Sequence, residues 1–330
     1  MQFINRTKNQ HFVSQTEQRL NARNPNAKSC NQEIYKFKII DRKKHQVAAG
    51  RSVKIENSLS LHDLFSFDVL DKDNRYNFEE LFSKYESELE KNTTSLLKNI
   101  NSQGLDVKGE IINIFLSKFL NFVRNPYTIK KVLNSFPVLK NLQPTDEKIL
   151  SNYEKVTKGK KPQIEHLCKR LNLPQKDYID WLRIIFLLKT VKLGDYNFFE
   201  HLIAELFNNP KTITQVDVYQ YDQDICLLSD RGFINSIDHN GILTYEFNLD
   251  SKNFIRFLFA DIQAVAPIWA DREIISKYCA LPKNIQVTVH KNDMDSLDSY
   301  NKLVIYQSFE HVFAAQKSPF GVNIDQTEIK

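Results

Sequence analysis

Glycine is scarce in this chain, with 8 copies in 330 residues. Phosphate-binding loops need closely spaced glycines so that the backbone can approach the phosphates, and neither GxGxxG nor GxxxxGK[ST] occurs in the sequence. The dinucleotide-binding and P-loop classes are therefore excluded. Cysteine is also rare, with 4 copies, and the cysteines are far apart and form no CxxC pair. That spacing fits neither a zinc knuckle nor a disulfide framework, so we expect a cytoplasmic protein.

Long hydrophobic runs are missing as well. The segment Met1–Gln10 is polar and lacks the hydrophobic core of a signal peptide. The most hydrophobic runs, 111–123 and 181–188, are too short or too interrupted by polar residues to span a bilayer. The net charge of +5 permits a nucleic-acid partner without requiring one. We expect a soluble protein with no membrane partner, and the sequence leaves its oligomeric state open.

Phenylalanine, by contrast, is abundant at 23 copies, and 42% of the residues are hydrophobic. The chain is long enough to bury a sizeable core. Its first periodic stretch, residues 9–21, has its hydrophobic residues on one face and predicts a helix. On the opposite flank His11, Gln15 and Arg19 follow one another at i, i+4 spacing. This row combines an imidazole, an amide and a guanidinium.

The rest of the sequence changes from helical to strand patterns. Alternation over Glu33–Asp41 and Gln46–Glu56 predicts a β-hairpin. Helical periodicity begins near Asn77 and predicts helices over 77–100, 110–125, 127–134, 146–157, 163–171, 175–192 and 197–207. Short β-branched or aromatic runs then predict strands over 213–219, 224–229, 243–248, 254–260 and 285–290.

These patterns predict a single α+β domain over residues 1–330. We expect it to be mostly helical, with an N-terminal hairpin and a small C-terminal β-sheet. Its sub-regions are an opening helix and hairpin at 1–60, a helical middle at 75–207, and the sheet at 211–315. The last sub-region includes a closing helix over Asp295–Ala315, and the tail Pro319–Lys330 is expected to fray.

The polar row on the first helix has two interpretations. In one, His11 moves a proton and Arg19 holds a phosphate or carboxylate, with Gln15 between them. In the other, the row is an ordinary polar flank that hydrogen-bonds neighbouring elements. Structural networks collect the same groups, so the residue types alone do not decide between the two.

Acidic residues beside the next helix suggest a metal site. Glu79, Glu86 and Glu90 lie within about forty degrees of one another around the helix axis. Carboxylate oxygens suit magnesium or manganese, and metal-dependent nucleases need such a set. The alternative is a solvated helix face.

Two further charged residues stand at the ends of predicted elements. Arg124 ends a strongly hydrophobic helix, where a cation favours the helix C-terminus but could equally point into a pocket and bind an anion. Asp230 closes a strand, a place for functional carboxylates, although turns also prefer Asp.

Several short motifs together resemble a known family. They are the opening stretch His11–Gln15 with Arg19–Asn21, the hairpin residues Ile34–Phe37, the paired glutamates within 79–88, Arg124–Pro126 and Leu228–Asp230. The last motif in this series is a predicted helix over 301–312 that begins at Asn301. In this order they resemble the bacterial domain-of-unknown-function family 4238. The resemblance covers most of the chain.

Members of that family are associated with anti-phage defence loci. The resemblance therefore implies a bacterial defence effector of the abortive-infection type. As an enzyme it would be a nuclease acting on nucleic acid, with a site drawn from His11, Gln15, Arg19, Glu79, Glu86, Arg124 and Asp230. The alternative is a non-catalytic sensor or protein-binding component that recognises a phage protein. From the order of the motifs we expect Arg124 and Asp230 to lie near His11.

Overall fold

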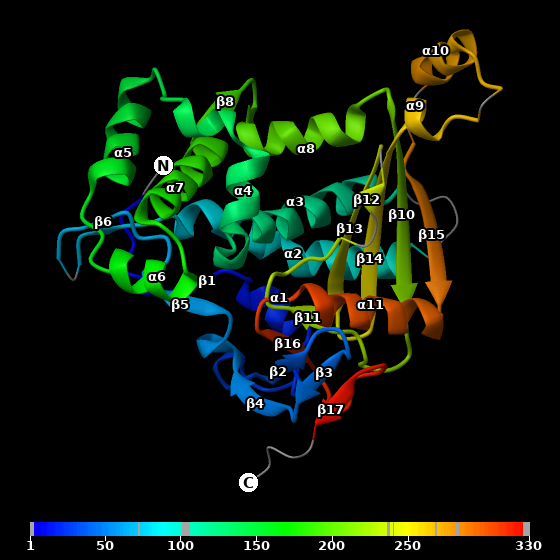
Figure 1. The fold of residues 1–330 in the computed structure, drawn as a ribbon, viewed down its shortest axis with the longest axis horizontal. Helices are drawn as coiled ribbons and strands as arrows, with labels where there is room; N and C mark the ends of the chain where they lie inside the picture. Colours follow the sequence, from blue (N-terminus) through cyan, green and yellow to red (C-terminus); the bar gives the residue numbers. More distant parts are fainter. Residues whose placement is uncertain are drawn as a thin grey trace.

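The computed structural model describes residues 3–71, 73–100, 106–235, 238–239, 241–267, 269–281 and 284–325. It shows an α+β fold with 44% helix and 23% strand (Figure 1). The prediction of a mostly helical protein with a small C-terminal sheet is therefore wrong. Helices hold less than half of the residues, and two large sheets replace the single small one.

The first large sheet has five strands in the order β12-β13-β14-β10-β15. Strand β10 pairs antiparallel with β14 and parallel with β15. This sheet lies to the right in Figure 1. The bounds of its strands are β10 Thr212–Gln220, β12 Asp238–His239, β13 Ile242–Asp250, β14 Asn253–Asp261 and β15 Gln286–Lys291.

The second large sheet has six strands and joins the two ends of the chain. Its order is β11-β16-β2-β3-β17, and β4 also pairs with β2. In Figure 1 the blue strand β2 lies beside the red β16. The bounds are β2 Glu33–Asp41, β3 Gln46–Ala48, β4 Arg51–Lys54, β11 Leu228–Ser229, β16 His311–Ala314 and β17 Asn323–Asp325.

The predicted N-terminal hairpin is thus part of a larger sheet. An isolated two-stranded hairpin leaves unpaired backbone groups on both edges and is marginally stable, so strands from the C-terminal region pair with it. Its second arm is interrupted between β3 and β4 at Gly50, where a Cβ atom would lie 2.5 Å from the ring of Phe37. Strand β17 pairs with β3 in the tail that was expected to fray. Residues 326–330 of that tail lie outside the described residues.

The predicted first helix is correct only in its second half. Residues Asn9–His11 form strand β1, which pairs with β5, Ser60–His62. Helix α1 covers Gln15–Arg19, and the Ser14 side chain accepts a hydrogen bond from the Glu17 N–H. An N-cap serine satisfies a backbone donor that has no partner within the helix, so the helix begins after Ser14.

Two short strand pairs complete the sheets: β6 Asp68–Val69 with β7 Arg75–Tyr76, and β8 Lys192–Leu193 with β9 Tyr196–Asn197.

The helices of the middle region follow the predicted pattern closely. Their bounds are α2 Glu79–Asn99, α3 Lys108–Arg124, α4 Ile129–Ser135, α5 Glu147–Lys158, α6 Ile164–Leu171, α7 Gln175–Thr190 and α8 Phe198–Asn208. Short 3-10 helices are η1 Ser29–Asn31, η2 Ile55–Asn57, η3 Pro126–Thr128 and η4 Val138–Asn141. The sequence did not predict α9 Ile262–Val265 or α10 Arg272–Ala280. The closing helix α11, Met294–Gln307, ends before its predicted limit, because the following residues form β16.

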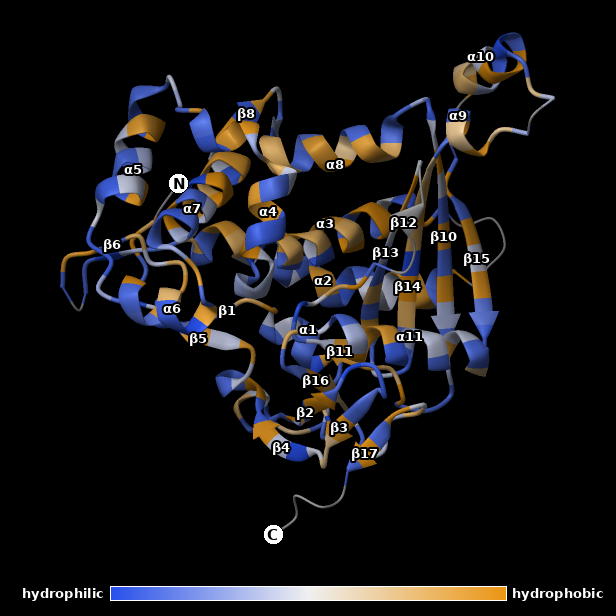
Figure 2. Ribbon diagram, viewed as in Figure 1, coloured by the Kyte–Doolittle hydropathy of each residue, from blue (hydrophilic) through white to orange (hydrophobic). Residues whose placement is uncertain are grey.

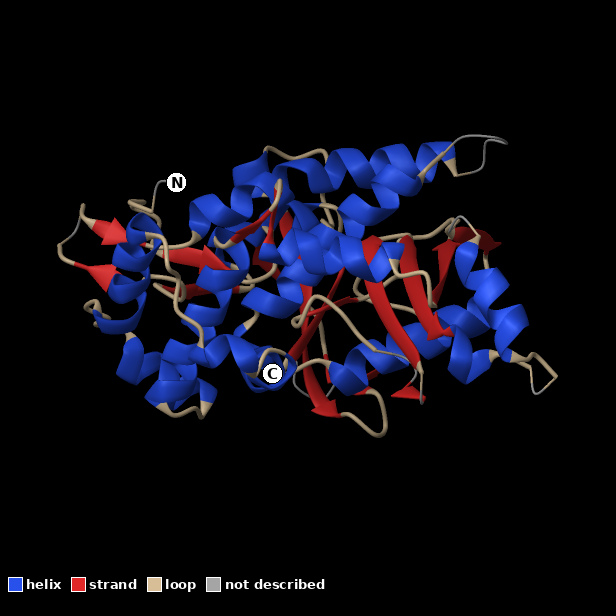
Figure 3. Cartoon of the chain, turned by 90° about the horizontal axis from the view of Figure 1, so that it is seen from above, coloured by secondary structure: helices blue, strands red, loops and turns tan. Residues whose placement is uncertain are grey.

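Helices cover both faces of the five-stranded sheet, which Figure 3 shows from above. On one face Phe115 of α3 packs edge-on against Phe257 of β14, with ring centroids 4.8 Å apart. Figure 2 shows how hydrophobic α3 is along its length. On the other face Tyr300 of α11 stacks on Phe254 at 4.0 Å. Such aromatic contacts dominate core energetics, which accounts for the high phenylalanine content.

Candidate functional site

All of the predicted site residues except Asp230 gather where α1, α2 and the end of α3 meet. Helix α1 packs against α2, and α2 packs against α3. Glu79 and Glu86 stand on α2, and Arg124 is the last residue of α3. Glu86 and Arg124 are both close enough to His11 to shift its pKa, and both also shift the pKa of Glu79. The tertiary fold therefore joins the first polar row to the glutamate helix.

The His11, Gln15 and Arg19 side chains form a hydrogen-bonded row. Arg19 Nη2 donates to Gln15 Oε1 at 2.6 Å, and Gln15 Nε2 lies 3.4 Å from His11 Nδ1. Because a guanidinium can only donate, the Gln15 amide must turn its NH₂ group toward the imidazole. The Nδ1 atom of His11 then accepts, and a neutral ring carries its proton on Nε2.

Arg124 holds Glu86 in place. Its Nη1 donates to Glu86 Oε1, and its Nη2 donates to Asn121 Oδ1 at 3.1 Å. The Arg124 side chain is 2% exposed, whereas that of Glu86 is 32% exposed. Glu86 therefore connects the cluster to the surface. Arg124 therefore combines parts of its two interpretations. Its cation stands at the C-terminus of a helix, and it also faces a polar cluster.

Burial shifts the pKa values of two groups in the cluster. Desolvation raises the pKa of Glu79 to about 7; Arg124 opposes this rise and Glu86 adds to it. Desolvation also lowers the pKa of His11, Arg124 adds to that effect, and the Ile55 carbonyl opposes it. At neutral pH His11 is consequently neutral, while Glu79 is a mixture of acid and carboxylate. Two carboxyl groups in unlike environments are a common basis for acid–base chemistry.

The cluster contains buried polar atoms that lack hydrogen-bond partners among the described residues. They are His11 Nε2, Arg19 Nε, Glu79 Oε1 and Arg124 Nε. Buried polar groups are nearly always satisfied in folded proteins. Four such atoms from neighbouring residues therefore indicate a place for water or a polar ligand.

Asp230 lies outside this cluster and has a structural role. Its carboxylate accepts hydrogen bonds from the N–H groups of Phe309, Glu310 and His311, at 2.7, 2.7 and 2.9 Å. Its backbone carbonyl accepts from the side chain of Asn125, the neighbour of Arg124. Asp230 thus fixes the start of β16 against the end of α3. The expected approach of Arg124 to His11 is present, whereas the Asp230 carboxylate faces β16.

The predicted set of metal ligands is not brought together. Across the part of the chain that the structure describes, no group of three or more His, Cys, Asp or Glu side chains is arranged to hold a metal ion. Glu90 is exposed on α2. Glu79 and Glu86 remain as a pair of carboxyl groups beside a cation.

The sequence interpretation missed a buried ion pair beneath the cluster. Lys118 Nζ contacts Glu17 Oε1 at 2.7 Å, and both side chains are 0% exposed. Asn121 donates to the other oxygen of Glu17 and links this pair to Arg124. The available signal was a lysine and an asparagine within a helix that is hydrophobic on most sides. A buried lysine on such a helix needs a buried acid.

A second missed group is Lys189 on α7. Its side chain is buried beside the rings of Tyr85 and Phe199, with Nζ 3.5 Å from the Tyr85 centroid. Desolvation lowers its pKa to about 6. The sequence offers only a lysine near the end of a hydrophobic helix, which is usually an ordinary C-terminal cation.

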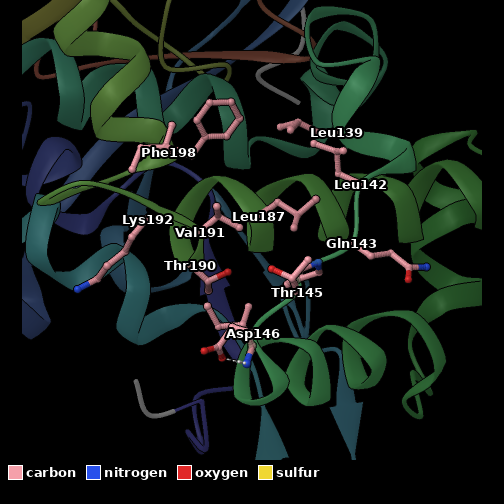
Figure 4. A pocket seen from close by; sticks show the side chains of 13 residues that line it. Leu139, Leu142, Gln143, Thr145, Asp146, Leu187, Thr190, Val191, Lys192 and Phe198 are labelled. Atoms are coloured by element: carbon pink, nitrogen blue, oxygen red, sulfur yellow. Dashed lines mark hydrogen bonds between the residues drawn. The ribbon is translucent and has the colours of Figure 1, made fainter.

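A cavity of about 630 Å³ lies apart from the cluster of His11, Glu79 and Arg124 (Figure 4). It is formed by η4, α5, α7, β8 and α8, and its walls are mostly hydrophobic, with Leu139, Leu142, Leu187 and Phe198 among them. Its Asp146 carboxylate is used as the N-cap of α5, accepting from the Ile149 N–H. The cavity brings together no acid–base pair, so it is not the candidate site.

Within the residues that the structure describes, no helix is both long and hydrophobic enough to cross a bilayer. Comparisons with protein-family models, curated proteins and solved structures give no match for this chain.

Proposed function

We propose that this protein is a bacterial anti-phage defence effector that hydrolyses phosphodiester bonds at the Glu79/Glu86 cluster. The observation that carries the proposal is the convergence of two unlike carboxyl groups with His11 and Arg124. The resemblance in the opening stretch and the later motifs supplies the defence context. Cytoplasmic nucleic acid is the proposed substrate.

The roles follow from the environment of each group. Glu86, held by Arg124 and partly exposed, takes a proton from a water molecule as it attacks phosphorus. Glu79 in its acid form, with a pKa of about 7, donates a proton to the oxygen that leaves when the P–O bond breaks. Afterwards Glu86 carries the proton and Glu79 is ionised, and exchange with solvent restores both.

Two further groups favour a phosphate over a neutral substrate. His11 presents its Nε2–H to the non-bridging oxygens, and its neutral ring keeps this donor in place throughout. Arg19 is half-buried and its Nε has no hydrogen-bond partner among the described residues, so it supplies a cation for the same phosphate. Gln15 positions both. Donors placed where charge develops are among the largest contributions to catalysis.

The test uses purified protein and labelled single-stranded RNA and DNA, together with phage plating efficiency in cells. His11→Ala and Glu79→Gln are expected to lose cleavage and protection by at least about a hundredfold, the usual effect of removing a donor to the reacting group or an acid–base group, respectively. His62→Ala is the matched control, because His62 is exposed on the neighbouring strand β5. Full protection by a folded His11→Ala variant would refute the proposal.

The sealed part of the network favours a second candidate function. Arg124 is almost fully buried, and the Glu17–Lys118 pair beneath it is completely buried, as in a structural polar core. In this case the chain is a non-catalytic sensor or protein-binding component that recognises a phage protein. It would protect cells without cleaving nucleic acid, metal chelation would have no effect, and surface substitutions would matter more than His11→Ala.

A further inference from the structure

The six-stranded sheet carries a group of basic side chains on one face. Side chains two apart on a strand share a face, so Lys36 and Lys38 of β2 point the same way. The register places Arg51 of β4 opposite Lys36, and His311 of β16 opposite Lys38. Lys36 and Arg51 are like charges directly opposed across strands, and such pairs destabilise a sheet. Such an arrangement indicates that something else stabilises it.

A cavity of about 150 Å³ lies beside this face. Lys36 and His311 line it from the sheet. Tyr127 of η3 and Arg170 of α6 line it from the helical side, and Ser60 adds a hydroxyl. Arg170 lies close enough to the Tyr127 hydroxyl to oppose the rise in its pKa that burial causes. Pockets for drug-sized ligands measure about 300–1,000 Å³. At about 150 Å³ this one therefore fits only a small group.

Two carboxylates, those of Asp230 and Glu310, also line the cavity and favour the charged form of Lys36. The oxygens of Asp230 accept from three backbone N–H groups. Glu310 is exposed, and its carboxylate lies 3.6 Å from His311 Nδ1. Within the described parts of the chain, Lys36, Arg51 and Arg170 take part in no ion pair with an acidic side chain.

The electrostatics of the face agree with this geometry. Burial lowers the pKa of Lys36 and the nearby Arg51 lowers it further, whereas Glu310 and Asp230 oppose this fall. Burial, followed by the charges of Lys36, Arg51, Lys38 and Arg170, lowers the pKa of His311 to about 4. An anion in the cavity would relieve the mutual repulsion of these groups.

We propose that this pocket binds a phosphate group, carried by a small phosphate compound or by the backbone of a nucleic acid. Arg170 supplies a planar fork of donors, and Lys36 supplies a compact charge. The tyrosine and serine hydroxyls complete the hydrogen bonding. Glu79 and Glu86 do not line this pocket, so phosphate binding here does not depend on the proposed hydrolysis.

The test measures binding by calorimetry for the wild-type chain and for Lys36→Gln and Arg170→Gln. Inorganic phosphate and a short single-stranded RNA are the two probes. We expect each substitution to weaken binding by about tenfold or more, with a smaller salt dependence for the RNA. Lys43→Gln is the matched control, because Lys43 is exposed in the turn between β2 and β3 of the same sheet.

The outcomes separate the two sources of phosphate. Binding of inorganic phosphate alone supports a small phosphate compound, and RNA binding that phosphate competes away supports a nucleic-acid backbone. Glu79→Gln should retain this binding, so loss of hydrolysis and loss of binding are distinguishable. Absence of binding for both probes, or equal weakening by Lys43→Gln, would overturn the inference. Thermal unfolding of each variant confirms that it is folded.

Discussion

Replacing Glu79 with glutamine should make the protein more stable at neutral and basic pH. The folded state raises the pKa of Glu79 from 4.5 to about 7, mainly through desolvation. The unfolded chain therefore loses this proton at a lower pH than the folded protein does. Stability falls as the pH rises from about 4.5 to about 7, and the cost is complete above that window.

The size of the effect follows from the pKa difference. At about 1.4 kcal/mol per pH unit, ionising Glu79 costs the folded state about 3 kcal/mol at pH 8. The same linkage gives about 1 kcal/mol at pH 5. Glutamine keeps the shape and cannot ionise, so Glu79→Gln should gain these amounts. Under the proposed function the variant also loses its proton donor, so stability would rise while cleavage falls.

Urea unfolding of both proteins at pH 5 and pH 8 measures this gain as a difference in unfolding free energy. All other titrations are common to both proteins and cancel in the comparison. Glu90→Gln, on the exposed side of the same helix, should change stability by less than about 0.5 kcal/mol at either pH. An equal gain at both pH values, or a loss at pH 8, would show that Glu79 is not held neutral by its surroundings.

Two further substitutions test buried contacts, one beneath the site and one in the six-stranded sheet. Lys118→Met leaves the Glu17 carboxylate buried without its cation and should lower the free energy of urea unfolding by about 3–5 kcal/mol. Adding Glu17→Leu to Lys118→Met should recover most of that loss. An additive loss in the double variant would contradict a buried ion pair. Gly50→Ala should lower the free energy of unfolding by about 1–3 kcal/mol, because the new methyl group meets the Phe37 ring. Phe37→Leu should offset part of this loss. Unchanged stability in Gly50→Ala would show that the ring can move aside.

The candidate site depended on both levels of structure. The closeness of His11, Gln15 and Arg19 is local, so the spacing indicated it even though His11 ends a strand. The approach of Glu79 and Arg124 requires α2 and α3 to pack together, and single-sequence periodicity cannot show which helices do so. The role of Asp230 could not be predicted from local spacing, because the backbone N–H groups that it binds lie about eighty residues away in the sequence.

The sequence by itself determined the helices α2 to α8 and the strands β10, β13 and β14 to within a few residues, because the period of the hydrophobic residues is a local property. Tertiary structure alone decided that the strands of the two chain ends form one sheet, because strand pairing is made by backbone groups that every sequence carries. It also decided which charged groups are buried. The pKa of Glu79 and the basic face around Lys36 follow from that burial and from strand register, and neither can be obtained from residue spacing.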